Sequence, residues 1–158
     1  MDAPEPAAVS RFKEAHSAAG GGGRVVILPD TVHTAVLAAE ALGCQVGAIA
    51  NSLLFDAGDT PVLILTSGSH RVDLAATAER IGVPTLKRAS PEFVRAHTSQ
   101  VIGGVSPLGH PSPVSTWLDV ALRKYDEIWG AAGHPAAVFS TTYDELLAMT
   151  GATEVEVD

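Results

Sequence analysis

A stretch rich in glycine and proline, Gly103-Gly104-Val105-Ser106-Pro107-Leu108-Gly109, offers the backbone best suited to chemistry in this chain. Such a composition disfavours a helix or a strand interior and favours a turn that can approach a ligand closely. The N–H groups of Gly104 to Ser106 could converge on one acceptor oxygen, as oxyanion sites require, with Pro107 fixing the curvature. The alternative is an ordinary tight turn between two strands.

A few polar side chains are further candidates for contacts to a substrate. Asn51 lies in a strand between Ile49 and Leu53, so its amide needs either a partner or a polar site wall. Of the six histidines we select His33, just before a predicted helix, and His110, beside the glycine-rich stretch. We predict no metal and no organic cofactor, since the sequence has no H-E-x-x-H or C-x-x-C pattern. Ser106 lacks a G-x-S-x-G context, so we expect a hydrogen-bond donor rather than a nucleophile.

The glycine-rich stretch, followed by Thr116-Trp117-Leu118-Asp119, resembles the signature loop of the YbaK/EbsC family. Members of that family are free-standing relatives of the prolyl-tRNA synthetase editing domain. Four more segments occur in the family's order and spacing, and the resemblance covers roughly residues 31 to 150. These segments are residues 34–42, 49–55, 71–74 and 89–92.

The resemblance implies a trans-editing aminoacyl-tRNA deacylase, which hydrolyses the ester of a wrong, small amino acid on a tRNA, with tRNA-Pro as the expected one. In the family, backbone amides of the loop bind the carbonyl, and a substrate hydroxyl helps to deliver water. The corresponding catalytic loop here is Gly103, Gly104, Val105, Ser106 and Pro107, of which all but the proline carry an N–H donor. Asp119 falls where the family has an aspartate, which lines the pocket floor or holds the loop. We expect His33, Leu108, Gly109, His110 and Asp119 to bind substrate. The implied partners are the aminoacyl-tRNA 3′ end and prolyl-tRNA synthetase, but no DNA or membrane.

Asn51 departs from the family pattern, which has a functional lysine at this position. An asparagine amide has two donors and one acceptor but no charge, whereas lysine offers a cation to a phosphate or acyl oxygen. Asn51 can still orient an ester carbonyl, or it can be a satisfied structural amide. Two alternatives to the deacylase therefore stay open: a non-catalytic module that binds aminoacylated 3′ ends or assists a synthetase, and a hydrolase of another small ester or amide.

Composition limits the class of protein. The 158 residues suit one domain with a sizeable core, and we expect residues 1–5 to be loose. No window approaches the roughly 18 uncharged apolar residues of a membrane span. A single cysteine, Cys44, and an N-terminus without a basic export signal predict a cytoplasmic protein. The net charge of −8 argues against a large phosphate-binding face, though not against a protein that handles only the end of an RNA.

Several predicted elements position these residues. A helix from Pro6 should bury Ala8, Phe12, Ala15 and Ala19 and end at the glycines 20–23, and Thr34 should begin the next helix. Strands 51–55 and 61–66 should form a hairpin. The remaining expected strands cover residues 24–28, 85–88, 115–122, 127–131, 136–140 and 153–157, and further helices begin after Asp73, Ser90 and Thr142. This mixed order predicts an α+β domain, and the resemblance implies a curved, partly barrel-like mixed sheet surrounded by helices.

Overall fold

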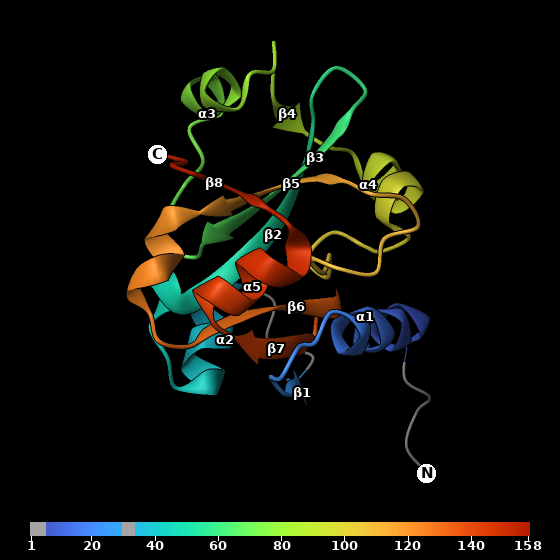
Figure 1. Ribbon diagram of the computed structural model, residues 1–158, viewed down its shortest axis with the longest axis vertical. Helices are drawn as coiled ribbons and strands as arrows, with labels where there is room; N and C mark the ends of the chain where they lie inside the picture. The colour runs from blue at the N-terminus through green and yellow to red at the C-terminus, as the bar shows by residue number, and fades with distance from the viewer. Residues whose placement is uncertain (1–5, 30–33) are drawn as a thin grey trace.

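The computed structural model describes residues 6–29 and 34–158, so the predicted loose residues 1–5 and the candidate His33 lie outside it. Figure 1 shows a mixed sheet with helices around it. The α-helices of the described residues are α1 (Ala7–Ala18), α2 (Ala35–Leu42), α3 (Leu74–Ile81), α4 (Pro91–Thr98) and α5 (Tyr143–Thr150). The strands are β1 (Val25–Ile27), β2 (Ile49–Asp56), β3 (Pro61–Ser67), β4 (Lys87–Arg88), β5 (Ser115–Asp119), β6 (Ile128–His134), β7 (Ala137–Thr141) and β8 (Thr153–Val155).

The strands form one sheet in the order β1-β7-β6-β2-β3-β5-β8, with β4 paired to β2 outside this path. Both parallel pairs, such as β2 with β6 and β3 with β5, and antiparallel pairs, such as β2 with β3, are present. The α+β class and the mixed sheet predicted from the sequence are therefore confirmed. The β2–β3 hairpin runs through the middle of the molecule, with α3 and α4 towards one end and α1 and α2 towards the other (Figure 1).

Polar side chains begin the helices where the sequence predicts them. Thr34 accepts a hydrogen bond from the Leu37 N–H at 3.1 Å, and Asp73 and Ser90 cap α3 and α4 in the same way. Such caps satisfy backbone donors that have no partner inside the helix. At the β2–β3 turn, Gly58 and Asp59 have φ angles of 66° and 70°, as a tight two-residue hairpin loop requires.

Two predictions about elements need correction. In α1 Phe12 is buried as predicted, but Val9 and His16 are buried with it in place of Ala8, Ala15 and Ala19, because Phe12 and His16 pack against Phe139 of β7. The strand predicted over residues 115–122 ends at Asp119, and a 3-10 helix (Val120–Lys124) follows. The turn occurs there because the Asp119 carboxylate accepts the Ala121 N–H at 2.9 Å.

Side chains that alternate along β2 belong to different packing clusters. Ala50 and Leu54 pack with Val94 and Val105 in the main core, which also includes Phe12, Leu63, Leu118 and Phe139. Phe55, in contrast, packs against α3 in a second cluster. Successive side chains of a strand point to opposite faces of the sheet. The main core thus lies on the inner face of β2, and α3 covers the outer face near Phe55.

Candidate functional site

A cleft of about 860 Å³ opens along β2 and contains residues from many parts of the chain. All residues from Ile49 to Phe55 contribute to its wall. Its inner part is apolar, with Ala89, Val94, Val105 and Ala131 among the lining residues. Its outer part is more polar, with Thr66, His70 and Arg71 beside Asn51. Both faces of β2 thus line one continuous cavity.

The structure brings three of the predicted site residues to this cleft: Asn51, Gly103 and Val105. Asn51 is directly opposite Thr66 in the β2–β3 register, which fixes its place on the wall. The other described candidates lie outside the lining, which places them behind the cleft or beside it. These residues are Gly104, Ser106, Pro107, Leu108, Gly109, His110 and Asp119.

The glycine-rich loop is held by its own hydrogen bonds. The Gly104 N–H donates to the Val101 carbonyl at 3.0 Å, and the Ser106 N–H donates to Gln100 Oε1 at 2.7 Å. The expectation that the amides of residues 104–106 converge on one acceptor was therefore wrong, because two of the three have partners within the protein. Among the described residues, the N–H groups of Gly103 and Val105 have none.

Ser106 stabilises the loop and does not face the cleft. Its side chain is fully buried, its Oγ donates to the Leu108 carbonyl, and Gln100 Nε2 donates to that Oγ at 2.9 Å. The interpretation of Ser106 as a donor is therefore correct for the loop but does not extend to a substrate in the cleft. His110 Nε2 lies 2.7 Å from the Ser106 carbonyl, and burial lowers the pKa of His110, while the Ser106 carbonyl opposes this shift.

Gly104 is buried because another turn lies against it. A Cβ at this position would lie 2.8 Å from the carbonyl carbon of His134 and from Pro135 Cδ, both in the β6–β7 turn. Gly103 has open space around it and a φ angle of +88°, which favours glycine. Glycine is therefore required at position 104 by close packing and favoured at position 103 by the backbone conformation.

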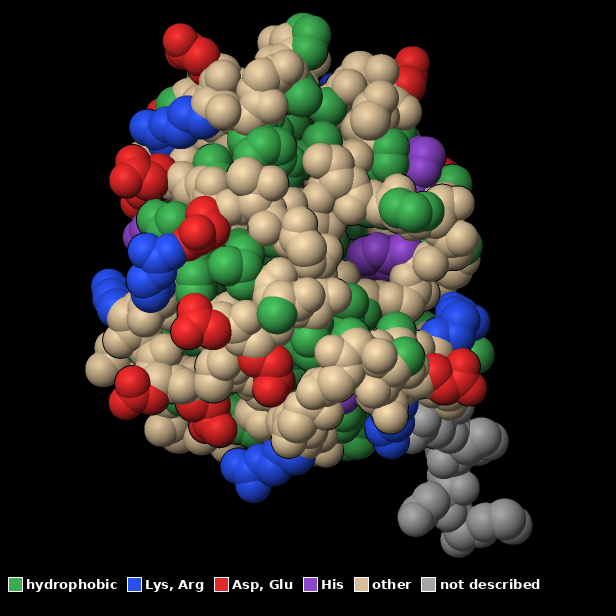
Figure 2. Space-filling view, viewed as in Figure 1, with side chains coloured by type: hydrophobic (Ala, Val, Ile, Leu, Met, Phe, Trp, Pro, Cys, Tyr) green, Lys and Arg blue, Asp and Glu red, His purple; other side chains and the backbone are tan. Residues whose placement is uncertain are grey.

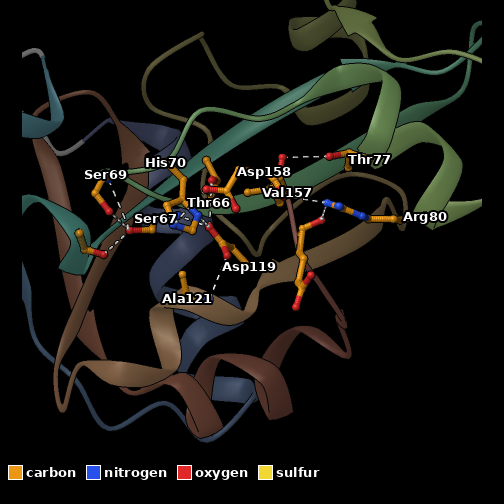
Figure 3. Close-up of polar contacts among 12 residues, drawn as sticks. Thr66, Ser67, Ser69, His70, Thr77, Arg80, Asp119, Ala121, Val157 and Asp158 are labelled. Carbon is orange, nitrogen blue, oxygen red and sulfur yellow. Dashed lines mark hydrogen bonds and ion pairs between the residues drawn. The ribbon is translucent and has the colours of Figure 1, made fainter.

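Asp119, at the end of β5, makes polar contacts with the end of β3 and lies beside His70 (Figure 3). Its fully buried Oδ2 accepts hydrogen bonds from the Ser67 N–H at 3.0 Å and from Thr66 Oγ1 at 3.2 Å. His70 Nδ1 is 3.0 Å from the same oxygen but makes no hydrogen bond to it or to any other described residue. Asp119 therefore holds the last two residues of β3, with the His70 ring beside it, rather than the glycine-rich loop or the floor of the cleft.

Sequence reasoning missed several lining residues. His70 and Arg71 are not among the predicted site residues, although both line the cleft. Ser52 also lines the cleft, and its Oγ is buried without a hydrogen-bond partner in the part of the chain that the structure describes. The strand alternation in residues 49–55 was a usable signal, because it placed a serine hydroxyl on the apolar face of β2. In the described residues, no cluster of three His, Cys, Asp or Glu side chains has the geometry to hold a metal.

Comparison with known proteins gives consistent matches. A family profile described as "Aminoacyl-tRNA editing domain" matches residues 29–149. A solved structure described as "a putative trans-editing enzyme for prolyl tRNA synthetase" superposes with a TM-score of 0.91 at 40% identity, covering 98% of this chain and 99% of that chain. No helix in the described part of the chain is long and apolar enough to cross a membrane.

Two curated relatives cover most of the same region. "Uncharacterized protein YwhH" of Bacillus subtilis (strain 168) is 32% identical over 110 residues, which is 69% of each chain. "Putative Cys-tRNA(Pro)/Cys-tRNA(Cys) deacylase EbsC" of Enterococcus faecalis (strain ATCC 700802 / V583) is 26% identical over 120 residues, 75% of this chain and 73% of that protein. The sequence resemblance and the fold therefore agree.

Proposed function

Since this chain belongs to the aminoacyl-tRNA editing domain family, we propose that it hydrolyses the ester between a small amino acid and the terminal ribose of a tRNA. Mischarged tRNA-Pro is the first substrate to test, with prolyl-tRNA synthetase as the enzyme whose errors it corrects. Such a second sieve has a physical reason. A synthetase pocket distinguishes side chains that differ by one methylene by only about 1–3 kcal/mol.

One observation supports this proposal: Asn51, Gly103 and Val105 line a single cleft, and the N–H groups of Gly103 and Val105 have no hydrogen-bond partner among the described residues. The Asn51 amide can donate to the ester carbonyl or to a ribose hydroxyl. Amides in a site of low dielectric can stabilise charge that develops on the carbonyl oxygen. An ester is reactive enough for positioning and electrostatics to suffice, so water delivered by a substrate hydroxyl replaces a side-chain nucleophile.

A binding module is the second candidate, and the neutral Asn51 is the observation that favours it. Where a lysine cation would stabilise a developing negative charge, an asparagine offers only a neutral donor. The cleft would then hold an aminoacylated 3′ end without turnover, as a sensor or synthetase accessory.

A panel of labelled aminoacyl-tRNAs tests these functions. The purified protein is incubated with each substrate, and hydrolysis and binding are measured in parallel, binding with amide-linked tRNA analogues that cannot be hydrolysed. Deacylation supports the enzyme, and binding without deacylation supports the module. If the protein neither binds nor deacylates any aminoacyl-tRNA, the tRNA function is ruled out, and a different small ester or amide becomes the expected substrate. Gln45→Ala, which removes an exposed amide outside the cleft lining, is the matched control for variants of Asn51.

A further inference from the structure

The sheet has a break beside β2, and this break lies in the cleft. Strand β6 pairs with β2 only at Ile49 and Ala50, and β4 pairs with it only at Phe55 and Asp56. Between these two partners, residues 51–54 pair with β3 alone among the described residues. One edge of β2 is therefore open over four residues, and all four line the cleft.

The hydrogen-bond phase of the β2–β3 ladder shows which backbone groups face the open edge. The Gly68 N–H donates to the Ile49 carbonyl at 2.7 Å, so this pair is a hydrogen-bonded one. Bonded and non-bonded pairs alternate in an antiparallel ladder. By the register, Asn51 and Leu53 then bond to β3, whereas the N–H and C=O of Ser52 point away from it. Both Ser52 backbone groups thus face the break.

The Ser52 side chain adds a third polar group. Its Oγ is buried and has no hydrogen-bond partner within residues 6–29 and 34–158. It lies on the same face of β2 as Ala50 and Leu54, which pack with Val94 and Val105 on the apolar side of the cleft. A buried hydroxyl without a partner carries a free-energy cost, because it has lost its hydrogen bonds to water. A bound group that supplies the missing partner recovers this cost.

We propose that Ser52 binds the aminoacyl group as a one-residue β-bridge and that its hydroxyl reads the amino-acid side chain. This rests on the proposed function and specifies its substrate. The Ser52 C=O accepts from the substrate α-ammonium, and the Ser52 N–H donates to the ester carbonyl, as two paired strand residues do. Paired residues place their side chains on the same face of the sheet. The substrate side chain then enters the apolar side of the cleft, beside Ser52 Oγ.

This arrangement predicts the chemical class of the amino acid. The side chain must be small, because Leu54, Val94 and Val105 on this side of the cleft are buried and packed together in the main core. It must also carry a hydrogen-bonding group, such as a hydroxyl, for Ser52. The α-amino group must be free, since acylation would add bulk and remove the charge at the Ser52 carbonyl. In the bridge, the Ser52 N–H donates to the ester carbonyl. It replaces the Gly104 and Ser106 N–H groups, which already donate to acceptors within the protein.

Binding is tested by NMR on the full-length, ¹⁵N-labelled protein with 3′-seryl-amino-3′-deoxyadenosine, a stable amide analogue of the ester. We expect a large shift of the Ser52 amide signal, absent with the N-acetylated analogue. Binding that leaves the Ser52 signal unmoved, equal effects of both analogues, or no binding at millimolar concentration would each overturn the proposal. A shifted Ser52 signal in a protein that hydrolyses no aminoacyl-tRNA would sustain the bridge and remove only the hydrolase function.

Specificity is tested with two substrates that differ by one oxygen atom, seryl-tRNA and alanyl-tRNA. Ser52→Ala should lower kcat/KM for seryl-tRNA about ten-fold and change that for alanyl-tRNA less than about two-fold. Ser17→Ala, on the exposed face of α1, is the matched control and should change neither. Equal losses for both substrates would indicate a structural role, and no loss for seryl-tRNA would show that the hydroxyl reads nothing. Circular dichroism confirms that each variant is folded.

Discussion

At the level of single residues, turnover should depend most on Asn51, whose amide shares the cleft with Gly103 and Val105. We expect Asn51→Ala to slow deacylation roughly ten- to a hundred-fold, because one hydrogen bond to a substrate group is lost. Stability should hardly change, since no other described residue depends on the Asn51 side chain for a hydrogen bond. Single-turnover kinetics with the preferred aminoacyl-tRNA measure the first effect, and urea unfolding measures the second.

Asn51→Lys is the complementary change, because it introduces the cation that the resembled family has at this position. We expect higher activity or an altered preference among aminoacyl-tRNAs, since a cation would meet a phosphate or carbonyl oxygen. The measurement is kcat/KM across the substrate panel. Activity in Asn51→Lys with none in the wild type would show that the natural protein is a binding module.

His110 should make stability depend on pH. Burial lowers its pKa below 6.5, so below that pH the unfolded chain binds more protons than the folded one. The free energy of unfolding should therefore fall as the pH drops from about 6.5 towards the folded-state pKa. Urea unfolding at a series of pH values should show a smaller fall for His110→Gln than for the wild type, with His97→Gln as control. Parallel curves for His110→Gln and the wild type would contradict this.

The sequence predicted a residue's place in the site where that residue type is unusual in its predicted element. Asn51 is such a residue, because a side-chain amide in an apolar strand needs a hydrogen-bond partner or a polar environment. The structure places it in the wall of the cleft. Ser106 and Asp119 drew attention for their chemistry, but their polar groups are engaged with Gln100 and Ser67 inside the protein. Such pairings join residues distant in the chain or across a loop, and no local pattern encodes them.

At the level of elements, the packing of the glycine-rich loop against the β6–β7 turn should be sensitive to one methyl group. Gly104→Ala would place a Cβ 2.8 Å from backbone atoms of His134 and Pro135, which have little freedom to move. We expect destabilisation of roughly 1–3 kcal/mol and a displaced loop. Gly22→Ala is the control, because its nearest contact would be an ordinary 3.7 Å. Equal stabilities of the two variants in urea unfolding would show that the loop adapts freely.

Most elements followed from local signals. Caps at Thr34, Asp73, Ser90 and Thr142 marked four helix starts, and a Gly-Asp turn marked the β2–β3 hairpin. The order of the strands in the sheet could not be predicted from these local signals, because the pairing of β2 with both β6 and β4 joins segments that are distant in the sequence. The break in the sheet, which creates the open edge at Ser52, arises from that order and was invisible in the sequence.

At the level of the whole molecule, charge limits how much nucleic acid the protein can hold. The chain has 18 acidic and 10 basic residues, and Figure 2 shows acidic and basic side chains dispersed over the visible face rather than gathered in one basic patch. Of the described residues that line the cleft, Arg71 and Arg88 are the Lys or Arg side chains. This distribution fits a protein that holds only the end of an RNA, because each phosphate contact needs its own cation.

Binding of an aminoacylated tRNA should therefore depend only weakly on salt. With two phosphate contacts to single-stranded RNA, the slope of log K against log salt concentration should be about −1.4. Arg71→Gln and Arg88→Gln should each reduce this slope by about 0.7. Arg95→Gln, which changes an exposed arginine outside the cleft lining, should leave it unchanged. Fluorescence titration with an amide-linked aminoacyl-tRNA between roughly 50 and 200 mM salt measures the slope over the range where counterion release is usually resolved. A slope steeper than about −4, or one unaffected by both cleft arginines, would mean that a larger surface holds the tRNA body and that the cleft does not set affinity.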